Sequence, residues 1–587
     1  MAIGDRVMFV PRHDGHHILP CSPLFSRLLR LAHRQPPKLA IRDAREKIER
    51  NHWELLSDVL ALREVIKTAL GEARVGALQN GEEVYIAVLA PGGYEYTIAV
   101  LAVLALGAAV VPLSVQVPMK EAEYFVQKCD AAALLSCSAS IAFGQELQTN
   151  IVNSTNPHFS CIPIQPSLSA PLMPISNIFV SSGRYLDDNG PGVVIFTSGT
   201  TGPPKAAVMR RAYVHDGALS VAEHYELTEH DTMLHVLPVH HATGVGINFF
   251  PFLVSGATIE FRSGGFDEVW LWDRWRAGAA NPGLRLTFFS GVPTIYMRMR
   301  RHYQLVLSKL PADKLAEYIA GARQFRALLC GTSALPHTIS DFWTELVGRR
   351  IAQRYGATEF GAVFKARLSD GQVPDGSVGE RVPGIDLKLS EGDEGEVLVK
   401  SPHMFSKYLR DPEATANAHD ANGYFKTGDI ARREGKYYWI VGRASIDIIK
   451  SGGYKISSLD IERELLALPY VAEAMVVGVP DDEFGQRVAA VISLLKEEVN
   501  EVFEADHSAN DHLLSIDSLR RDLRRRLAGY KMPTLLRVIE GELPKSGTGK
   551  VAKKVLGPHY FPLGYHNLPE VQVWRARQAA VEIHAKL

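Results

Sequence analysis

The sequence predicts an α/β protein with a large N-terminal domain of layered α/β subdomains plus a small barrel, followed by a small α+β domain. Short apolar, β-branched runs recur between helical patterns, which is typical of α/β layers with largely parallel sheets. With 587 residues the chain is too long for a single hydrophobic core. The composition also changes near residue 442, so we expect at least two domains.

The predicted strands of the first part are short buried runs over residues 84–89, 193–196, 232–237, 286–289 and 327–330. Residues 98–117 form an apolar stretch of roughly the twenty residues that cross a membrane. Gly107 and Pro112 interrupt it, so we expect a buried helix that ends near Leu106 and a short strand over 109–111. No membrane span is predicted.

Residues 370–442 are richer in loops, and the runs 397–400 and 437–441 predict antiparallel strands or a small barrel. After residue 442 the pattern predicts a helix over 458–467, strands over 471–479 and 487–495, and a basic helix over 518–527. This order is that of a compact α+β unit. We therefore assign residues 1–442 to the large domain, 443–555 to the small domain and 556–587 to a helical tail.

Charge, cysteines and the last residues bear on partners and location. The net charge of −1 gives no reason to expect nucleic acid or an anionic membrane as a partner. Five scattered cysteines without a CxxC pair favour a reducing compartment. The end Ala585-Lys586-Leu587 is similar to the Ser-Lys-Leu peroxisomal address. We predict peroxisomal import through its receptor, with the cytoplasm as the alternative if the tripeptide is a chance match.

The strongest local motif follows the predicted strand 193–196. Its glycines leave backbone N–H groups open, its hydroxyls add donors and its lysine adds a positive charge, which suits the β- and γ-phosphates of a nucleotide. It is not a Walker A loop. The alternative is a flexible surface loop. A phosphate-binding pattern that continues over nine positions after a strand argues against this alternative. The motif spans residues 197–205, and the predicted binding residues are Thr197, Ser198, Gly199, Thr200, Thr201, Gly202 and Lys205.

This loop resembles the phosphate-binding signature of the acyl-CoA synthetase, adenylation-domain and luciferase superfamily, and further motifs follow in the family's order over roughly residues 25–555. The resemblance implies an ATP-dependent ligase that joins a small-molecule carboxylic acid to AMP, releases pyrophosphate and transfers the acyl group to coenzyme A. It also implies Mg²⁺ as a cofactor and a mobile C-terminal domain. The chain departs from the loop pattern at Ala206, where the family usually has glycine.

A second family motif covers residues 355–359 and, by resemblance, lies beside the adenine ring and the α-phosphate. It consists of Tyr355, Gly356, Ala357, Thr358 and Glu359. The resemblance implies that Thr358 contacts the α-phosphate and that Glu359 ligates Mg²⁺. A hard cation between phosphate oxygens and one carboxylate is sensible chemistry. The alternative is a turn with an exposed glutamate.

A third motif ends at Asp429, and Arg443 follows it. In the family this aspartate accepts hydrogen bonds from both ribose hydroxyls, and the arginine also reaches the ribose. A carboxylate in a fixed turn suits a vicinal diol. The alternative is a surface Asp/Arg pair.

Residues 447–455 resemble the family's hinge and glycine-rich loop, so the small domain is expected to turn within residues 444–447. The loop residues Lys450, Gly452 and Gly453 are expected to line the coenzyme A channel. Lys550 is the predicted catalytic lysine, because it follows Gly-Thr-Gly in residues 543–550. There it would stabilise charge in the adenylation transition state. The neighbouring Lys553 is expected on the solvated surface.

The acid pocket is expected from two further segments. One spans residues 240–244 and contains His241, which by resemblance flanks the acyl group; a structural histidine is the alternative. The other begins at Gly331 and includes Ser333 and Ala334, where the backbone would pass beside adenine and the acyl group.

The identity of the acid is less constrained. Residues 291–298 resemble malonyl-CoA synthetases of the acyl-CoA synthetase family member three type, which predicts that Arg298 pairs with the distal carboxylate. Alternatively Arg298 lies on an outward helix face. The malonate ligases usually have His-x-His-Gly where this chain has His241-Ala242-Thr243-Gly244. Malonate or another small dicarboxylate is predicted first. A fatty, aromatic or polyketide-derived acid, a carrier-protein thiol as acceptor, or a luciferase-type oxidation are alternatives.

Overall fold

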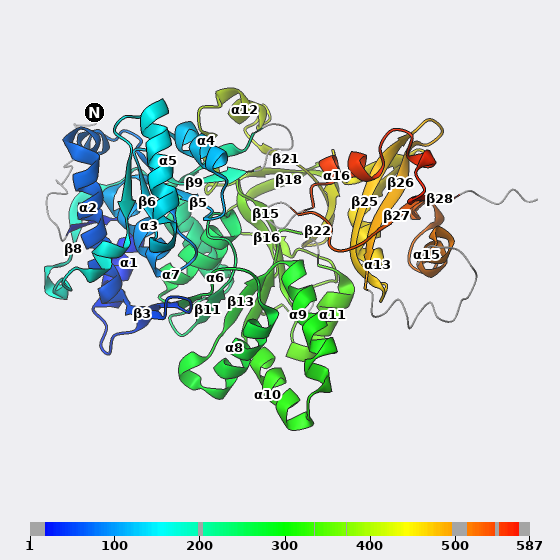
Figure 1. Ribbon diagram of the computed structural model, residues 1–587, viewed down its shortest axis with the longest axis horizontal. Coiled ribbons are helices and arrows are strands. Elements are labelled where there is room, and N and C mark those ends of the chain that lie inside the picture. The colour runs from blue at the N-terminus through cyan, green and yellow to red at the C-terminus, as the bar shows by residue number, and fades with distance from the viewer. Residues whose placement is uncertain are drawn as a thin grey trace, which may run out of the picture.

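The computed structural model describes residues 18–197, 203–333, 335–370, 373–495, 514–545 and 551–574. Two large sheets, with helices around them, form the main body, and a four-stranded sheet lies at one end of the molecule (Figure 1). This arrangement confirms the predicted fold class of a large α/β domain followed by a small α+β domain.

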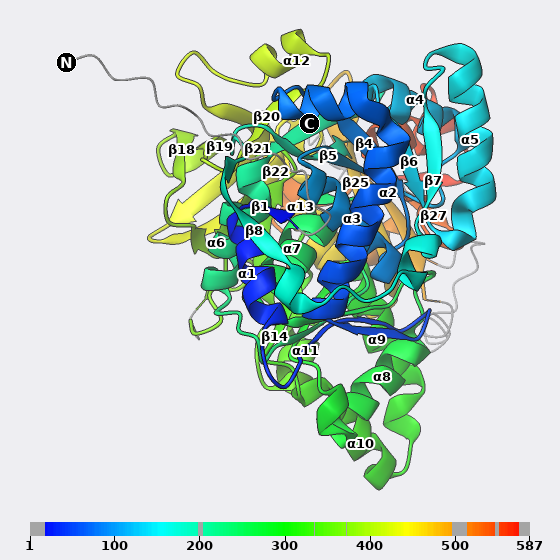
Figure 2. The ribbon, with the colours of Figure 1, turned by 90° about the vertical axis from the view of Figure 1, so that its left-hand side faces the viewer.

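The first large sheet has the strand order β20-β10-β9-β5-β4-β6-β7. Helices α2 (His52–Gln79) and α3 (Tyr94–Leu106) lie side by side on one face, and α4 (Met119–Cys129) and α5 (Ile141–Ser154) cover the other (Figure 2). The strands are β20 (Phe405–Tyr408), β10 (Lys205–Arg210), β9 (Pro191–Thr197), β5 (Ala109–Leu113), β4 (Tyr85–Leu89), β6 (Ala133–Ser136) and β7 (Ser160–Pro163).

Helix α3 is the apolar segment that resembles a membrane span in sequence. Nearly all of its residues are buried, and it ends at Gly107, whose φ of 90° is left-handed and favours glycine. The strand β5 follows directly and pairs in parallel with β4. Within the described residues no helix is long and apolar enough to span a bilayer.

The second large sheet is parallel in one half and antiparallel in the other. Strands β14 (Ala327–Cys330), β13 (Phe288–Gly291), β11 (Thr232–His235), β12 (Thr258–Phe261) and β2 (Leu39–Asp43) are parallel. One face is covered by α8 (Glu268–Ala280), α9 (Pro293–Leu305), α10 (Ala312–Arg323) and α11 (His337–Val347). The other face shares a continuous core with α1 (Pro23–Ala32), α2, α3 and α7 (Phe250–Ser255).

The antiparallel half continues the same sheet beyond β14. It contains β15 (Ala352–Ala357), which is parallel to β14, and then β16 (Gly361–Lys365), β17 (Glu380–Arg381), β22 (Tyr437–Arg443), β21 (Phe425–Glu434), β19 (Glu394–Lys400) and β18 (Asp386–Glu391). The loop-rich part of the sequence therefore forms antiparallel strands that continue the parallel sheet.

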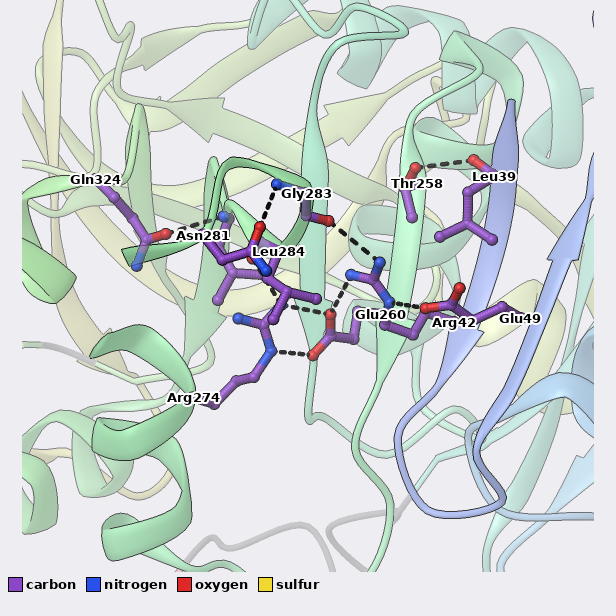
Figure 3. Close-up of polar contacts among 11 residues, drawn as sticks. Leu39, Arg42, Glu49, Thr258, Glu260, Arg274, Asn281, Gly283, Leu284 and Gln324 are labelled. Carbon is purple, nitrogen blue, oxygen red and sulfur yellow. Dashed lines mark hydrogen bonds and ion pairs between the residues drawn. The ribbon is translucent and has the colours of Figure 1, made fainter. Parts of the chain in front are cut away.

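A buried ion-pair network joins this sheet to α8. Glu260 of β12 is 1% exposed and lies between two arginines (Figure 3). Arg274 of α8 donates to both carboxylate oxygens at 2.5 and 2.6 Å, and Arg42 of β2 donates to Oε2 at 3.0 Å. Because both charges of such a pair must find partners out of water, the network fixes the position of α8 on the sheet.

The small sheet has the order β25-β26-β27-β28, with strands β25 (Val471–Asp481), β26 (Gly485–Leu494), β27 (Leu535–Ile539) and β28 (Val571–Val573). Helices α13 (Ser458–Leu465) and α15 (Ile516–Leu523) pack on one face. The tail differs from the prediction. Up to residue 574 it contributes α16 (Lys553–Tyr560) and the edge strand β28, which pairs with β27, because its apolar residues join the small core. Residues 575–587 lie outside the described part.

Candidate active site

The predicted phosphate loop connects two antiparallel strands. Thr197 and Lys205 are register partners at the facing ends of β9 and β10, and the Thr197 hydroxyl donates to the Lys205 carbonyl at 3.4 Å. The predicted residues Ser198, Gly199, Thr200, Thr201 and Gly202 lie outside the described residues. The Lys205 ammonium lies 5.0 Å from the centroid of the Tyr408 ring. The lysine at the end of the loop is therefore held by a neutral aromatic face.

The turn between β15 and β16 carries Thr358 and Glu359. Gly356 is required there, since a Cβ atom would lie 2.1 Å from the Gly361 carbonyl oxygen. The Tyr408 hydroxyl donates to Glu359 Oε1 at 2.7 Å, and the backbone N–H of Phe405 donates to the Glu359 carbonyl at 2.8 Å. The structure thus brings the predicted metal ligand to the same tyrosine that contacts Lys205. Sequence reasoning did not select Tyr408.

The predicted ribose residues also meet. Asp429 and Arg443 are register partners in β21 and β22, and Arg443 Nε donates to Asp429 Oδ1 at 2.8 Å. The Tyr355 hydroxyl donates to Asp429 Oδ2 at 2.6 Å. Burial and the neighbouring Asp429 raise the pKa of Tyr355 well above its usual value, so it stays a neutral donor. A buried, oriented carboxylate is therefore available beside residues 355–359.

A chain of contacts leads from this carboxylate into the small domain. The backbone N–H of Arg443 donates to Asp447 Oδ2 at 3.1 Å, and Lys553 Nζ donates to Asp447 Oδ1 at 2.7 Å. Lys553 also lies 2.8 Å from Glu462, and only 11% of its side chain is exposed. Although burial lowers it, these two carboxylates raise the pKa of Lys553. Its expected position on the solvated surface is therefore wrong. Lys550 lies outside the described residues.

The predicted coenzyme A residues are on the small domain's surface. Lys450, Gly452 and Gly453 are exposed in and between the strands β23 (Ile448–Ser451) and β24 (Tyr454–Ser457). Gly452 and Gly453 have left-handed φ values of 54° and 84°, which a tight glycine turn requires. The loop is thus accessible, and its role in coenzyme A binding stays a prediction.

The predicted acid-pocket residues lie in two segments, one with the histidines and one that begins at Gly331. His240 and His241 have ring centroids 4.4 Å apart, and burial together with His241 lowers the pKa of His240 to about 3. Gly331 is buried at the end of β14, while Ser333 is exposed. Ala334 lies outside the described residues. Histidines and Gly331 remain candidates for the pocket wall.

Arg298 is partly exposed and paired with an acidic side chain. Its side chain is 43% exposed, and its guanidinium donates to Glu268 at 3.0 Å and lies over the Phe266 ring. Helix α9 buries Pro293, Tyr296 and Met299, so position 298 falls on the outward face. The binding of the distal carboxylate of the acid by Arg298 therefore stays a prediction.

Two cations that the sequence did not single out are buried in β15 and β16, and one of them, Arg354, lies beside Gly331. Arg354 is 7% exposed and Lys365 is 1% exposed, and they are register partners in β15 and β16. A Cβ atom at Gly331 would lie 3.2 Å from Arg354 Nε, and Arg354 Nη2 donates to Ser290 Oγ at 3.4 Å. Their signal in the sequence is weak, since isolated Arg and Lys residues are usually at the surface.

Comparison with known proteins decides the family. A profile of the AMP-binding enzyme matches residues 32–409, and one of the AMP-binding enzyme C-terminal domain matches residues 460–550.

The chain belongs to the AMP-binding enzyme family.

It is similar to the acyl-CoA ligase oryP of Aspergillus oryzae, at 31% identity over 93% of each chain. It is also similar to the mitochondrial malonate–CoA ligase ACSF3 of Mus musculus, at 30% identity over 95% of each chain. Among solved structures it resembles a malonyl-CoA ligase in ternary product complex with methylmalonyl-CoA and AMP, with a TM-score of 0.57, 29% identity and coverage of 88% of this chain and 99% of that one.

The comparisons correct the predicted location. The ACSF3 ligases of mouse, Xenopus laevis, human and cattle that resemble this chain are mitochondrial. The peroxisomal prediction from Ala585-Lys586-Leu587 is therefore wrong. A three-residue resemblance is a weak signal, and these residues lie outside the described part of the chain.

Proposed function

We propose that this AMP-forming carboxylic acid–CoA ligase activates a small dicarboxylate, with malonate as the first candidate. The observation that carries the proposal is the buried pair Arg354 and Lys365. Neither side chain forms an ion pair with a carboxylate of the described residues, and Arg354 Nη1 has no hydrogen-bond partner among them. Buried cations without a counter-charge are costly, so an anionic ligand group would complement them.

The position of the pair supports this assignment. Ser290 and Gly331 lie at the carboxyl ends of the neighbouring parallel strands β13 and β14, where open α/β sheets bind ligands. Arg354 lies beside both. A dicarboxylate could direct one carboxylate to ATP and the other to Arg354 and Lys365. The malonate activity named for several similar ligases agrees with this charge arrangement.

In the first half-reaction a carboxylate oxygen attacks the α-phosphorus of ATP, and the bond to pyrophosphate breaks. Lys205 and the loop 197–205 would hold the phosphates, Thr358 the α-phosphate, and Asp429 with Arg443 the ribose. Lys550 would approach the forming acyl phosphate bond. In the second half-reaction the thiol of coenzyme A loses its proton, its sulfur attacks the acyl carbon and AMP leaves.

Glu359 fits a magnesium ligand. Mg²⁺ prefers one or two carboxylates together with phosphate oxygens and water. Glu359 is partly exposed and contacts the same tyrosine, Tyr408, as Lys205 does. Only its Oε1 is engaged by a side chain of the described residues. When bound, the ion neutralises charge on the phosphates as pyrophosphate leaves.

We also propose that residues 1–442 and 443–555 move relative to each other, with the hinge at 444–447. Arg443 precedes this segment and Asp447 is its last residue, and the two bond to each other through backbone and side-chain atoms. A turn within 444–447 would exchange the face carrying Lys550 for the face carrying Lys450, Gly452 and Gly453.

The acid specificity is tested with two matched variants. In Arg354→Met and Lys365→Met, kcat/KM for malonate should fall about 100-fold or more, because each removes a charged partner of a buried carboxylate. Activity with butyrate should change much less. Pyrophosphate release in the presence of coenzyme A measures both. Arg349→Leu, at an exposed arginine, is the control, and we expect it to affect neither acid selectively. Equal losses for both acids in the Arg354 and Lys365 variants would refute the proposal.

The pH dependence tests Lys365 separately. Burial, with Arg354 and Arg367 as further cations nearby, lowers the pKa of Lys365 to about 7. A carboxylate binds the protonated form, so the KM for malonate should stay constant below pH 7. Above pH 7 it should rise by up to about tenfold per pH unit, because the free enzyme loses the ammonium proton. Lys365→Met should abolish this rise, and butyrate should not show it.

A further inference from the structure

The Tyr408 side chain contacts both Lys205 and Glu359. Its ring faces the Lys205 ammonium, with 5.0 Å between Nζ and the ring centroid, and its hydroxyl donates to Glu359 Oε1 at 2.7 Å. Lys205 and Glu359 form no ion pair with each other, although both lie against the same side chain. Opposite charges this close would otherwise attract each other strongly.

The backbone of Tyr408 is fixed to the phosphate-loop strand. Tyr408 pairs with Ala207 in the antiparallel contact of β20 and β10, and the N–H of Leu409 donates to the Ala206 carbonyl at 2.8 Å. The N–H of Tyr408 donates to Thr415 Oγ1 at 2.9 Å, from α12 (Pro412–Asn417). The side chain is 6% exposed. The backbone of Tyr408 is therefore held by β10 and α12 before any ligand binds.

The phenol is chemically suited to stand between two charges. Burial and the neighbouring Glu359 raise the pKa of Tyr408 far above neutral pH, so the hydroxyl remains a donor. The face of the ring carries partial negative charge and attracts an ammonium, while the hydroxyl satisfies a carboxylate oxygen. Each charge thus has a partner that does not neutralise it.

We infer that Tyr408 is a positioning residue that separates Lys205 from Glu359 and keeps both charges available for metal-bound ATP. This rests on the proposed function, which gives Lys205 to the phosphates and Glu359 to the metal. Without the ring, Lys205 and Glu359 would pair directly, and each would lose its ligand. If only the hydroxyl were removed, the ring would still separate Lys205 from Glu359, but the Glu359 carboxylate would lose the hydrogen bond that orients it.

Two variants separate the ring from the hydroxyl. Tyr408→Phe should bind metal-free ATP, measured calorimetrically with EDTA present, with the parent's affinity. In the presence of ATP it should bind Mn²⁺, measured by electron paramagnetic resonance, about tenfold more weakly. Tyr408→Leu should weaken both the binding of metal-free ATP and the binding of Mn²⁺ in the presence of ATP. The control Tyr318→Phe also removes a tyrosine–carboxylate bond, from Tyr318 to Asp273 at 2.8 Å, but far from the loop, and should change neither.

A rescue variant distinguishes positioning from misfolding. In Tyr408→Leu with Glu359→Gln, Lys205 has no carboxylate to pair with, so affinity for metal-free ATP should return to the level of Glu359→Gln alone. Failure of this recovery, or parental Mn²⁺ affinity in Tyr408→Phe, would overturn the inference. No acid is present in these measurements. If the parent protein bound no ATP, the proposed function itself would fall.

Discussion

Replacing Lys550 with alanine is expected to lower acyl-adenylate formation by about 10²–10³-fold, because removal of one preorganised charge at the reacting group has effects of this size. Thioester formation from a preformed acyl-adenylate should be much less affected, since the role proposed for Lys550 is confined to the adenylation step. Single-turnover measurements of the two half-reactions separate these effects.

Lys554→Ala provides the matched control for this prediction. Lys554 is exposed in the same terminal segment, on α16, four residues from Lys550. Its replacement should leave both half-reactions at the parental rates. If Lys550→Ala released pyrophosphate as fast as the parent, the assignment of Lys550 as the adenylation residue would be wrong.

Replacing Glu260 with alanine is expected to destabilise the large domain by about 3–5 kcal/mol, since removing one member of a buried ion pair leaves an uncompensated charge. Here two arginines, Arg42 and Arg274, would lose their shared carboxylate. Differential scanning calorimetry should show the large-domain transition shifted down by several degrees. The small-domain transition should not move.

Glu49→Ala is the control for Glu260→Ala, because Glu49 also accepts a hydrogen bond from Arg42 but is 57% exposed. An exposed pair contributes at most about 1 kcal/mol, so this variant should melt close to the parent. The double variant Glu260→Met with Arg274→Met should regain part of the lost stability. Equal melting of Glu260→Ala and Glu49→Ala would show that burial does not strengthen this network.

Much of the fold could be predicted from hydrophobic pattern and glycine positions. The buried helix ending before Gly107 and the strand after it follow from local sequence, and so do β25 and β26. The structure of the tail could not be predicted, because β28 forms only by pairing with β27. A run of three residues gives no sequence signal for such a long-range contact.

The site could be predicted where a motif fixes a short segment. Asp429 and Arg443 meet because strands β21 and β22 place them in register. The residues that connect one motif to another were not predicted. Tyr408 joins two motifs from a third strand, and Lys553 joins α16 to the hinge, so each is recognisable only from its partners in space. The exposure of Arg298 could not be predicted from its motif, because it depends on which side of α9 is buried.

The most direct test of the proposed chemistry is to identify the products formed from ATP, malonate and coenzyme A. We expect mass spectrometry to detect malonyl-CoA and AMP in equal amounts, with pyrophosphate released. When coenzyme A is omitted, malonyl-adenylate should remain bound to the protein. Formation of ADP and phosphate, or consumption of ATP without malonyl-adenylate, would contradict the account.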